Sequence, residues 1–146
     1  MLEAKVGVAM EEKQGIRIAL VTVDLFAAVS AIVGAIGLVV GFMNIPLSVL
    51  SGSPFTDFTV PALLLGVVVG GSALAAATIE VFGPWRFMAL ASAAAGCVMA
   101  GWIMVEVAMI GLGSWMQPFY FAVGLLMIAL AGLRWRATTR AAAVAH

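Results

Sequence analysis

Apolar residues occur along this chain in four long blocks, which are separated by short stretches rich in glycine, proline and polar residues. A membrane hydrocarbon core about 30 Å thick needs about 20 helical residues, because each residue adds about 1.5 Å. Blocks of this length lie at residues 18–43, 59–82, 85–111 and 118–135. The pattern therefore predicts an all-α integral membrane protein with four spans.

Helix breakers and aromatic residues mark the ends of these blocks. Pro61, Pro84 and Pro118 lie at or near the first turn of a predicted helix, where the missing N–H costs little. Aromatic side chains that favour membrane interfaces stand at three block ends: Trp85, Trp115 and Trp135. Both signals agree with the span boundaries.

Composition narrows the class of protein further. Hydrophobic residues make up 64% of the 146-residue chain and charged residues only 10%, which is too little polar surface for a water-soluble enzyme or a nucleic-acid binder. Cys97 is the only cysteine and His146 the only histidine. A redox cysteine pair, a histidine metal cage and a Ser-His-Asp site are thereby excluded. We expect a single membrane domain over residues 1–146, with no catalytic residues, metal or cofactor.

The distribution of basic residues predicts an orientation. All seven lie on one side of the predicted membrane: Lys5, Lys13 and Arg17 before the first span, Arg86 between the second and third, and Arg134, Arg136 and Arg140 after the fourth. The positive-inside rule then places both termini in the cytoplasm of an antiparallel up-down-up-down four-helix bundle. Residues 1–17 become a cytoplasmic or interfacial segment, 44–58 an external loop and 136–146 a cytoplasmic tail. The alanine- and glycine-rich composition indicates a bacterial inner membrane.

Small residues recur at helical spacing in three of the four blocks. Helices in lipid associate through close backbone approach at such positions. The predicted helix-packing residues are Gly34, Gly37 and Gly41 in the first block, Gly66 and Gly70 in the second, and Ala93, Cys97 and Gly101 in the third. Gly124 and Gly132 in the fourth block are spaced too widely to contribute much. The series serve packing within one chain or between chains.

Three stretches carry a resemblance. They are Ser53–Pro61, Gly66–Ala77 and Trp115–Tyr120, which together cover 27 of the 146 residues. In them the sequence resembles small four-span bacterial membrane proteins of unassigned function. The resemblance implies a four-span fold and no activity.

Two carboxylates lie inside the membrane near the predicted cytoplasmic side. Asp24 follows Arg17 by seven residues, or about 10 Å along a helix, and Glu80 stands near the end of the second span. Both share a helical face with alanines, so we expect them to point inward at the level of Arg17, Arg86 and Arg134. The five form either an ion-pair cluster that fixes helix register or the inner end of a proton or substrate path.

Glu106 lies in the outer part of the third span, where the sequence offers no basic partner. It points into an outer cavity under the 44–58 loop, faces another protein, or stays protonated and bonds Tyr120, Gln117 or Ser114. Four further residues are expected on the same outer side as Glu106, and we call them the outer polar cluster: Asp57, Trp102, Gln117 and Tyr120.

Three functions remain open. The first is a non-catalytic accessory or assembly component, which contacts membrane lipid but no nucleic acid and forms a homo-oligomer or joins a larger membrane complex. The second is a small proton- or cation-coupled transporter or channel that uses Glu106 outside and Asp24 with Glu80 inside. A gap of about 15–20 Å, filled almost entirely by Gly, Ala, Val, Leu and Met, separates these levels, which weighs against a stand-alone pump. The third is a lipid-active enzyme that uses Glu106 and Asp57.

Overall fold

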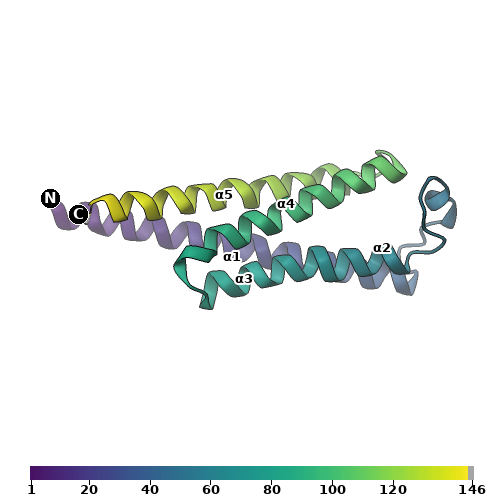
Figure 1. The fold of residues 1–146 in the computed structure, drawn as a ribbon, viewed down its shortest axis with the longest axis horizontal. Helices are drawn as coiled ribbons and strands as arrows, with labels where there is room; N and C mark the ends of the chain where they lie inside the picture. Colours follow the sequence, from purple (N-terminus) through teal and green to yellow (C-terminus); the bar gives the residue numbers. More distant parts are fainter. Residues whose placement is uncertain (145–146) are drawn as a thin grey trace.

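The computed structural model describes residues 1–144, so residues 145–146 of the expected tail lie outside it. Figure 1 shows long helices that lie side by side, with short connections at both ends of the bundle. The elements in chain order are α1 (Leu2–Val40), the 3₁₀ helix η1 (Leu47–Gly52), α2 (Thr59–Leu63), the π-helical segment η2 (Leu64–Gly70), α3 (Gly71–Phe82), α4 (Trp85–Ile110) and α5 (Met116–Val144).

The predicted all-α class is confirmed for the described residues. Within them, four helices are long and apolar enough to cross a membrane: Glu3–Val40, Thr59–Phe82, Trp85–Ile110 and Met116–Arg140. The second of these coincides with the predicted block 59–82, and the third ends one residue before the predicted 111. α2, η2 and α3 follow one another without a break and form a single span-length helix.

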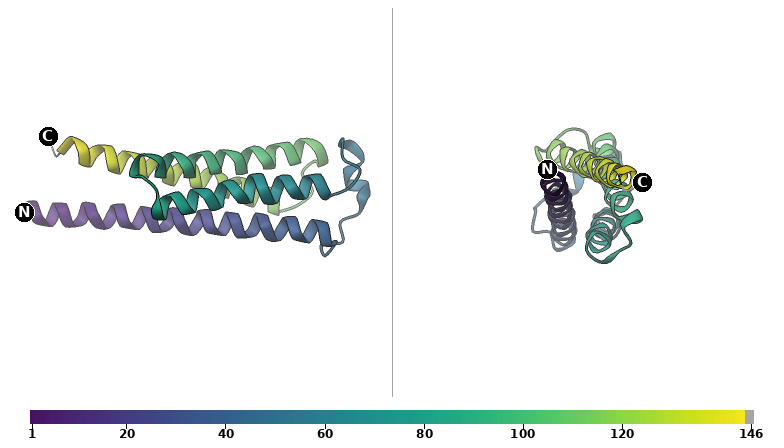
Figure 2. Two further views of the ribbon diagram at one scale, coloured as in Figure 1. Left: turned by 60° about the horizontal axis from the view of Figure 1, so that its bottom comes forward. Right: turned by 90° about the vertical axis from the view of Figure 1, so that its left-hand side faces the viewer.

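The first helix is longer than the sequence pattern indicated. α1 runs for 39 residues without a break, so residues 2–17 continue the same helix as the first apolar block. At about 1.5 Å per residue its length is about 58 Å, nearly twice a hydrocarbon core. Figure 2 shows that α1 and α5 both project past the turn between α3 and α4, and that the two termini lie at this same end.

Small side chains dominate the core between the helices. The buried cluster consists of Ala27, Ala28, Ala31, Val69, Ala73, Ala76, Ala95, Met99, Val123 and Met127. Alanine faces bring helix backbones close together, which is how helices associate where no hydrophobic force acts between them. α1 packs against η2, α3 and α5, while α4 packs against α3 and α5.

Two glycines bring the backbones of α4 and α5 close together. A Cβ built on Gly96 would lie 2.7 Å from the carbonyl oxygen of Gly124, and one built on Gly124 would lie 2.9 Å from the carbonyl oxygen of Gly96. The expectation that Gly124 contributes little is therefore wrong. A single well-placed glycine is enough, because its partner on the facing helix is also a glycine.

The small-residue series predicted for the third span faces the wrong way for packing within the bundle. Cys97 is exposed, Ala93 is half-buried, and a Cβ on Gly101 would meet no described atom within 4 Å. The buried face of α4 instead carries Ala89, Ser92, Ala95, Gly96, Met99, Ala100 and Ile103. Both faces have small residues at helical spacing, and the face that carries Gly96 is the one that packs against Gly124 of α5.

Three of the five predicted glycines in the first two spans do pack between helices. A Cβ on Gly66 would lie 3.0 Å from the Ala35 Cβ, and one on Gly70 would lie 2.9 Å from Ile32 Cγ1. Gly34 faces Leu65 of η2 in the same way, at 3.3 Å.

Gly37 and Gly41 serve the end of α1 instead. Gly37 faces the side chain of Met43 on its own loop, at 3.5 Å. Gly41 has φ +73° and nothing among the described atoms within 4 Å, so it is the left-handed residue that ends the helix. Neither glycine packs against another helix among the described residues.

Candidate functional site

Buried polar side chains gather in the half of the bundle that holds the termini. Asp24 of α1, Glu80 of α3 and Ser92 of α4 have no exposed surface. Arg134 of α5 reaches them with a side chain that is 12% exposed, and Arg17 of α1 lies beside them. We call these five residues the inner polar cluster. Each of the four span-length helices supplies at least one member.

Asp24 is held by a hydroxyl from the opposite side of the bundle. Ser92 Oγ donates to Asp24 Oδ2 at 2.7 Å. Asp24 Oδ1 has no hydrogen-bond partner among the described residues. The expected inward position of Asp24 on the alanine face of α1 is confirmed, since Ala27, Ala28 and Ala31 are buried with it.

Glu80 and Arg134 form the only salt bridge within the described part of the chain. Arg134 Nε lies 3.3 Å from Glu80 Oε2, in an orientation that makes an ion pair without a hydrogen bond. The other guanidinium nitrogens donate to the carbonyl oxygen of Lys13 at 3.2 Å and to Met88 Sδ at 3.1 Å. Arg134 therefore ties α5 to α1, α3 and α4 at one level.

Arg17 binds the end of α3 rather than a carboxylate. Its Nε donates to the Glu80 carbonyl oxygen at 3.0 Å and its Nη2 to the Val81 carbonyl oxygen at 2.9 Å. The last carbonyls of a helix lack intrahelical partners and carry its negative dipole end, so a guanidinium there is favourable. Arg17 thus fastens α1 to α3.

Arg86 is not part of this cluster. Its side chain is exposed, and its guanidinium carbon lies 4.8 Å from the centre of the Phe87 ring. The prediction that all three arginines meet the buried acids is wrong for Arg86, because the first turn of α4 directs it away from the bundle.

Gln117 holds the opposite turn, between α4 and α5. Its side chain is 2% exposed, and its Oε1 accepts from the backbone N–H groups of Gly113 at 3.1 Å and Ser114 at 3.4 Å. Its Nε2 donates to the Gly111 carbonyl oxygen at 3.1 Å and to Glu106 Oε1 at 3.3 Å. Of the partners expected for Glu106, the amide of Gln117 is confirmed.

The other members of the outer polar cluster make separate contacts. Tyr120 stacks on Phe26, with ring centres 6.3 Å apart, and Trp102 packs against the core one turn from Glu106. Asp57 is exposed and accepts the backbone N–H of Thr59 at 2.8 Å. This hydrogen bond holds the pKa of Asp57 below its usual value. Gln117, rather than Glu106, is the residue that organises this end.

Apolar side chains fill the bundle between its two polar ends. Among the described residues, the buried polar side chains are Asp24, Glu80, Ser92 and Gln117. The first three belong to the inner polar cluster, while Gln117 lies at the opposite turn.

Within residues 1–144, no group of three or more His, Cys, Asp or Glu side chains is placed so that it could hold a metal ion.

Comparison with family models, curated protein sequences and solved structures found no match to this chain. The roles of the residues above are therefore inferred from geometry and charge.

Proposed function

We propose that this chain is a non-catalytic component of a bacterial inner membrane, with both termini in the cytoplasm, that assembles with itself or with a larger membrane complex. The single observation that carries this proposal is the outward face of α4. It presents small residues at regular spacing, and most of its side chains are exposed.

The outward face of α4 follows a heptad spacing. Its positions alternate in steps of four and three residues: Leu90, Ala94, Cys97, Gly101, Met104 and Ala108. Gly101 is half-buried and the others are exposed. A repeat of about 3.5 residues keeps one seam of a helix turned toward a partner helix. We call these six residues the α4 seam.

Physical chemistry favours a helix as the neighbour of this seam. In lipid, helices associate where small side chains permit close contact, and four of the six seam positions are Ala, Cys or Gly. Gly101 has open space around its Cα among the described atoms, so a facing backbone can approach there. The inner polar cluster and the Gln117 turn cross-link the four helices, which suits a rigid scaffold.

The transporter hypothesis is the second candidate. It is favoured by buried carboxylate oxygens of Asp24 and Glu80 that lack hydrogen-bond partners among residues 1–144. The apolar interior between these acids and Glu106 argues against it. Proteoliposomes carrying Glu106→Gln should show the same proton and cation flux as wild type if the assembly proposal holds. Flux that disappears in the variant would make the transporter the better assignment.

Cys97, the only cysteine of the chain, lies in the α4 seam and provides the test. Native membranes are treated with copper phenanthroline, and a second sample with a maleimide–diazirine crosslinker. A disulfide-linked dimer supports self-assembly, and a crosslinked product of one defined larger mass supports a foreign subunit.

The matched control moves the thiol to α5. A Cys97→Ala, Leu126→Cys variant carries it at a position that is 46% exposed and outside the α4 seam. Gly101→Leu in the wild-type background should abolish the Cys97 product while the monomer stays folded. Equal crosslinking from Leu126→Cys, or a product unaffected by Gly101→Leu, would overturn the proposal.

A further inference from the structure

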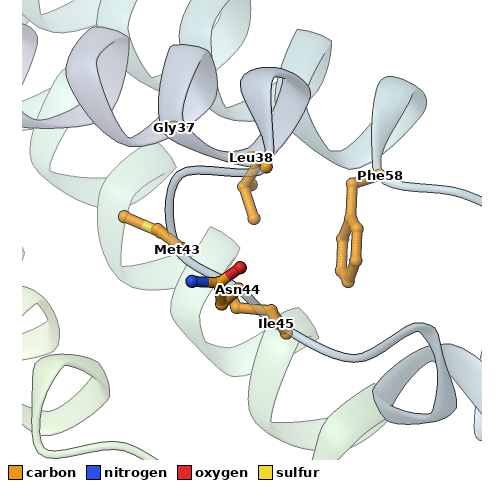
Figure 3. A pocket seen from close by; sticks show the side chains of 7 residues that line it. Gly37, Leu38, Met43, Asn44, Ile45 and Phe58 are labelled. Atoms are coloured by element: carbon orange, nitrogen blue, oxygen red, sulfur yellow. The ribbon is translucent and has the colours of Figure 1, made fainter.

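A cavity opens where α1 ends, at the end of the bundle away from the termini. Its volume is about 280 Å³, and it is lined by Gly37, Leu38, Gly41, Met43, Asn44, Ile45 and Phe58. Figure 3 shows Leu38 and Phe58 extending toward the loop that carries Asn44 and Ile45. The last turn of α1, the loop after it and the residue before α2 thus enclose one space.

The lining divides into an apolar part and an uncharged polar part. Leu38, Ile45 and Phe58 supply hydrocarbon, and the amide of Asn44 is the only polar side chain among the described lining residues. The last four carbonyl groups of a helix have no intrahelical partner, and Gly37 and Leu38 belong to that turn of α1. The cavity therefore offers carbonyl acceptors and one amide that both donates and accepts.

The backbone conformation of Asn44 holds this residue in the lining of the cavity. Asn44 is the only described residue other than glycine with a positive φ, at +46°. Its N–H donates to the Gly41 carbonyl oxygen at 3.1 Å, which closes a tight turn directly after the helix. Asparagine tolerates this conformation better than most residues, and glycine adopts it freely.

We propose that this cavity binds a single-chain lipid with an uncharged, hydroxyl-bearing headgroup, of the monoacylglycerol class. Hydroxyl groups donate to the free carbonyls of α1 and exchange hydrogen bonds with the Asn44 amide, while the first methylenes of the chain contact Leu38, Ile45 and Phe58. No charged side chain among the described lining residues is available to compensate an ionic headgroup, so an uncharged one fits better.

Size and position agree with this ligand class. The cavity matches the liquid volume of about nine water molecules at about 30 Å³ each, which accommodates a glycerol head and the first methylenes but not a whole lipid. The rest of the chain would lie along the apolar surface of α1, where Val39 and Val40 are 63% and 72% exposed. Single-chain lipids at the surface of a membrane have this polarity and shape.

The test uses the full-length protein in phosphatidylcholine nanodiscs with a photoreactive monoacylglycerol that carries a diazirine in its acyl chain. After illumination, mass spectrometry maps the labelled peptides. We expect label on residues 37–45 and on the peptide with Phe58, and competition by unlabelled monooleoylglycerol. Fatty-acid and lysophosphatidylglycerol probes of the same chain length should label these peptides less.

Two variants keep the result interpretable. Asn44→Gly preserves the left-handed backbone and removes the amide, so labelling should fall about threefold to tenfold. Leu38→Trp fills the cavity and should abolish labelling. Unfolding in detergent and the Cys97 crosslink check that both variants keep the bundle and its assembly, which separates this proposal from the one above. Equal labelling in wild type and both variants, or equal labelling by the anionic probes, would refute it.

Discussion

The hydroxyl of Ser92 on α4 and the carboxylate of Asp24 on α1 are joined by a 2.7 Å hydrogen bond between two fully buried side chains. These residues are 68 positions apart in the sequence and belong to helices that have few other contacts with each other. The bond therefore links two helices that lie diagonally across the bundle.

Loss of this hydroxyl should weaken the bundle. Ser92→Ala leaves a buried carboxylate without its one hydrogen-bond donor, and we expect a loss of about 1–3 kcal/mol in the free energy of unfolding. Reversible unfolding in mixed detergent measures it. Ser30→Ala is the matched control, because Ser30 Oγ bonds only the Phe26 carbonyl oxygen of its own helix. Equal stability of the two variants would show that the Ser92 bond contributes nothing.

The ion pair of Glu80 and Arg134 should be coupled rather than additive. Arg134→Gln leaves a fully buried carboxylate without its counter-charge, which typically costs about 3–5 kcal/mol. Glu80→Gln combined with Arg134→Gln should cost less than Arg134→Gln alone, because both charges are then absent. A double-mutant cycle of thermal unfolding gives the coupling energy. Arg86→Gln, at an exposed arginine, should change stability by less than about 0.5 kcal/mol.

An added methyl group should lower the stability of the monomer at one glycine of α4 and leave it unchanged at the other. In Gly96→Ala the new Cβ would lie 2.7 Å from a backbone oxygen of α5, so α4 and α5 must separate, at a cost of about 1–3 kcal/mol. Gly101→Ala meets no described atom within 4 Å and should leave monomer stability unchanged. Unfolding of both purified variants distinguishes them. A loss of stability in Gly101→Ala alone would invert the assignment of the buried face.

The loop before α2 should respond to pH through Asp57. The Thr59 N–H donates to its carboxylate, so the pKa of Asp57 in the folded protein lies below its ordinary value of 3.8. A lowered pKa stabilises the folded loop above pH 3.8, and this stabilisation is lost as the pH falls through the folded-state pKa. The Thr59 amide NMR shift should titrate with a midpoint below 3.8, and the titration should disappear in Asp57→Asn. A wild-type midpoint at or above 3.8 would contradict the bond.

The sequence predicted where the helices begin and end better than it predicted which side of each helix is buried. Span length and hydropathy located the helix from residue 59 to 82 to the residue, because crossing a membrane requires a fixed length of apolar chain. The rotation of α4 was not predictable in this way. Small or apolar residues occur on every side of this helix, and both Ala93–Cys97–Gly101 and Ser92–Gly96–Ala100 have small residues four apart. Tertiary contacts distinguish the two faces: Gly96 meets Gly124 of α5, and Ser92 donates a hydrogen bond to Asp24 of α1.

The positions of some polar residues could likewise be predicted from the sequence, whereas those of others could not. Asp24 was predictable as a buried group, because it shares a face with alanines that pack. The importance of Gln117 does not follow from the sequence, because it depends on one hydrogen bond to Glu106 and three to a turn whose shape the sequence does not specify. Arg86 was misplaced since a charge near the end of a helix can point either inward or outward, and only the first turn of α4 determines which.

The unbroken length of α1 gives the molecule a mechanical property. Arg17 fastens α1 to the end of α3, Arg134 holds the carbonyl of Lys13, and eleven more residues continue the same helix to Leu2. At about 1.5 Å per residue this arm is about 16 Å long, so a tilt of about 10° about Lys13 moves its tip by about 3 Å. Any rearrangement of the helices that tilts α1 is thus converted by leverage into a larger displacement of the N terminus.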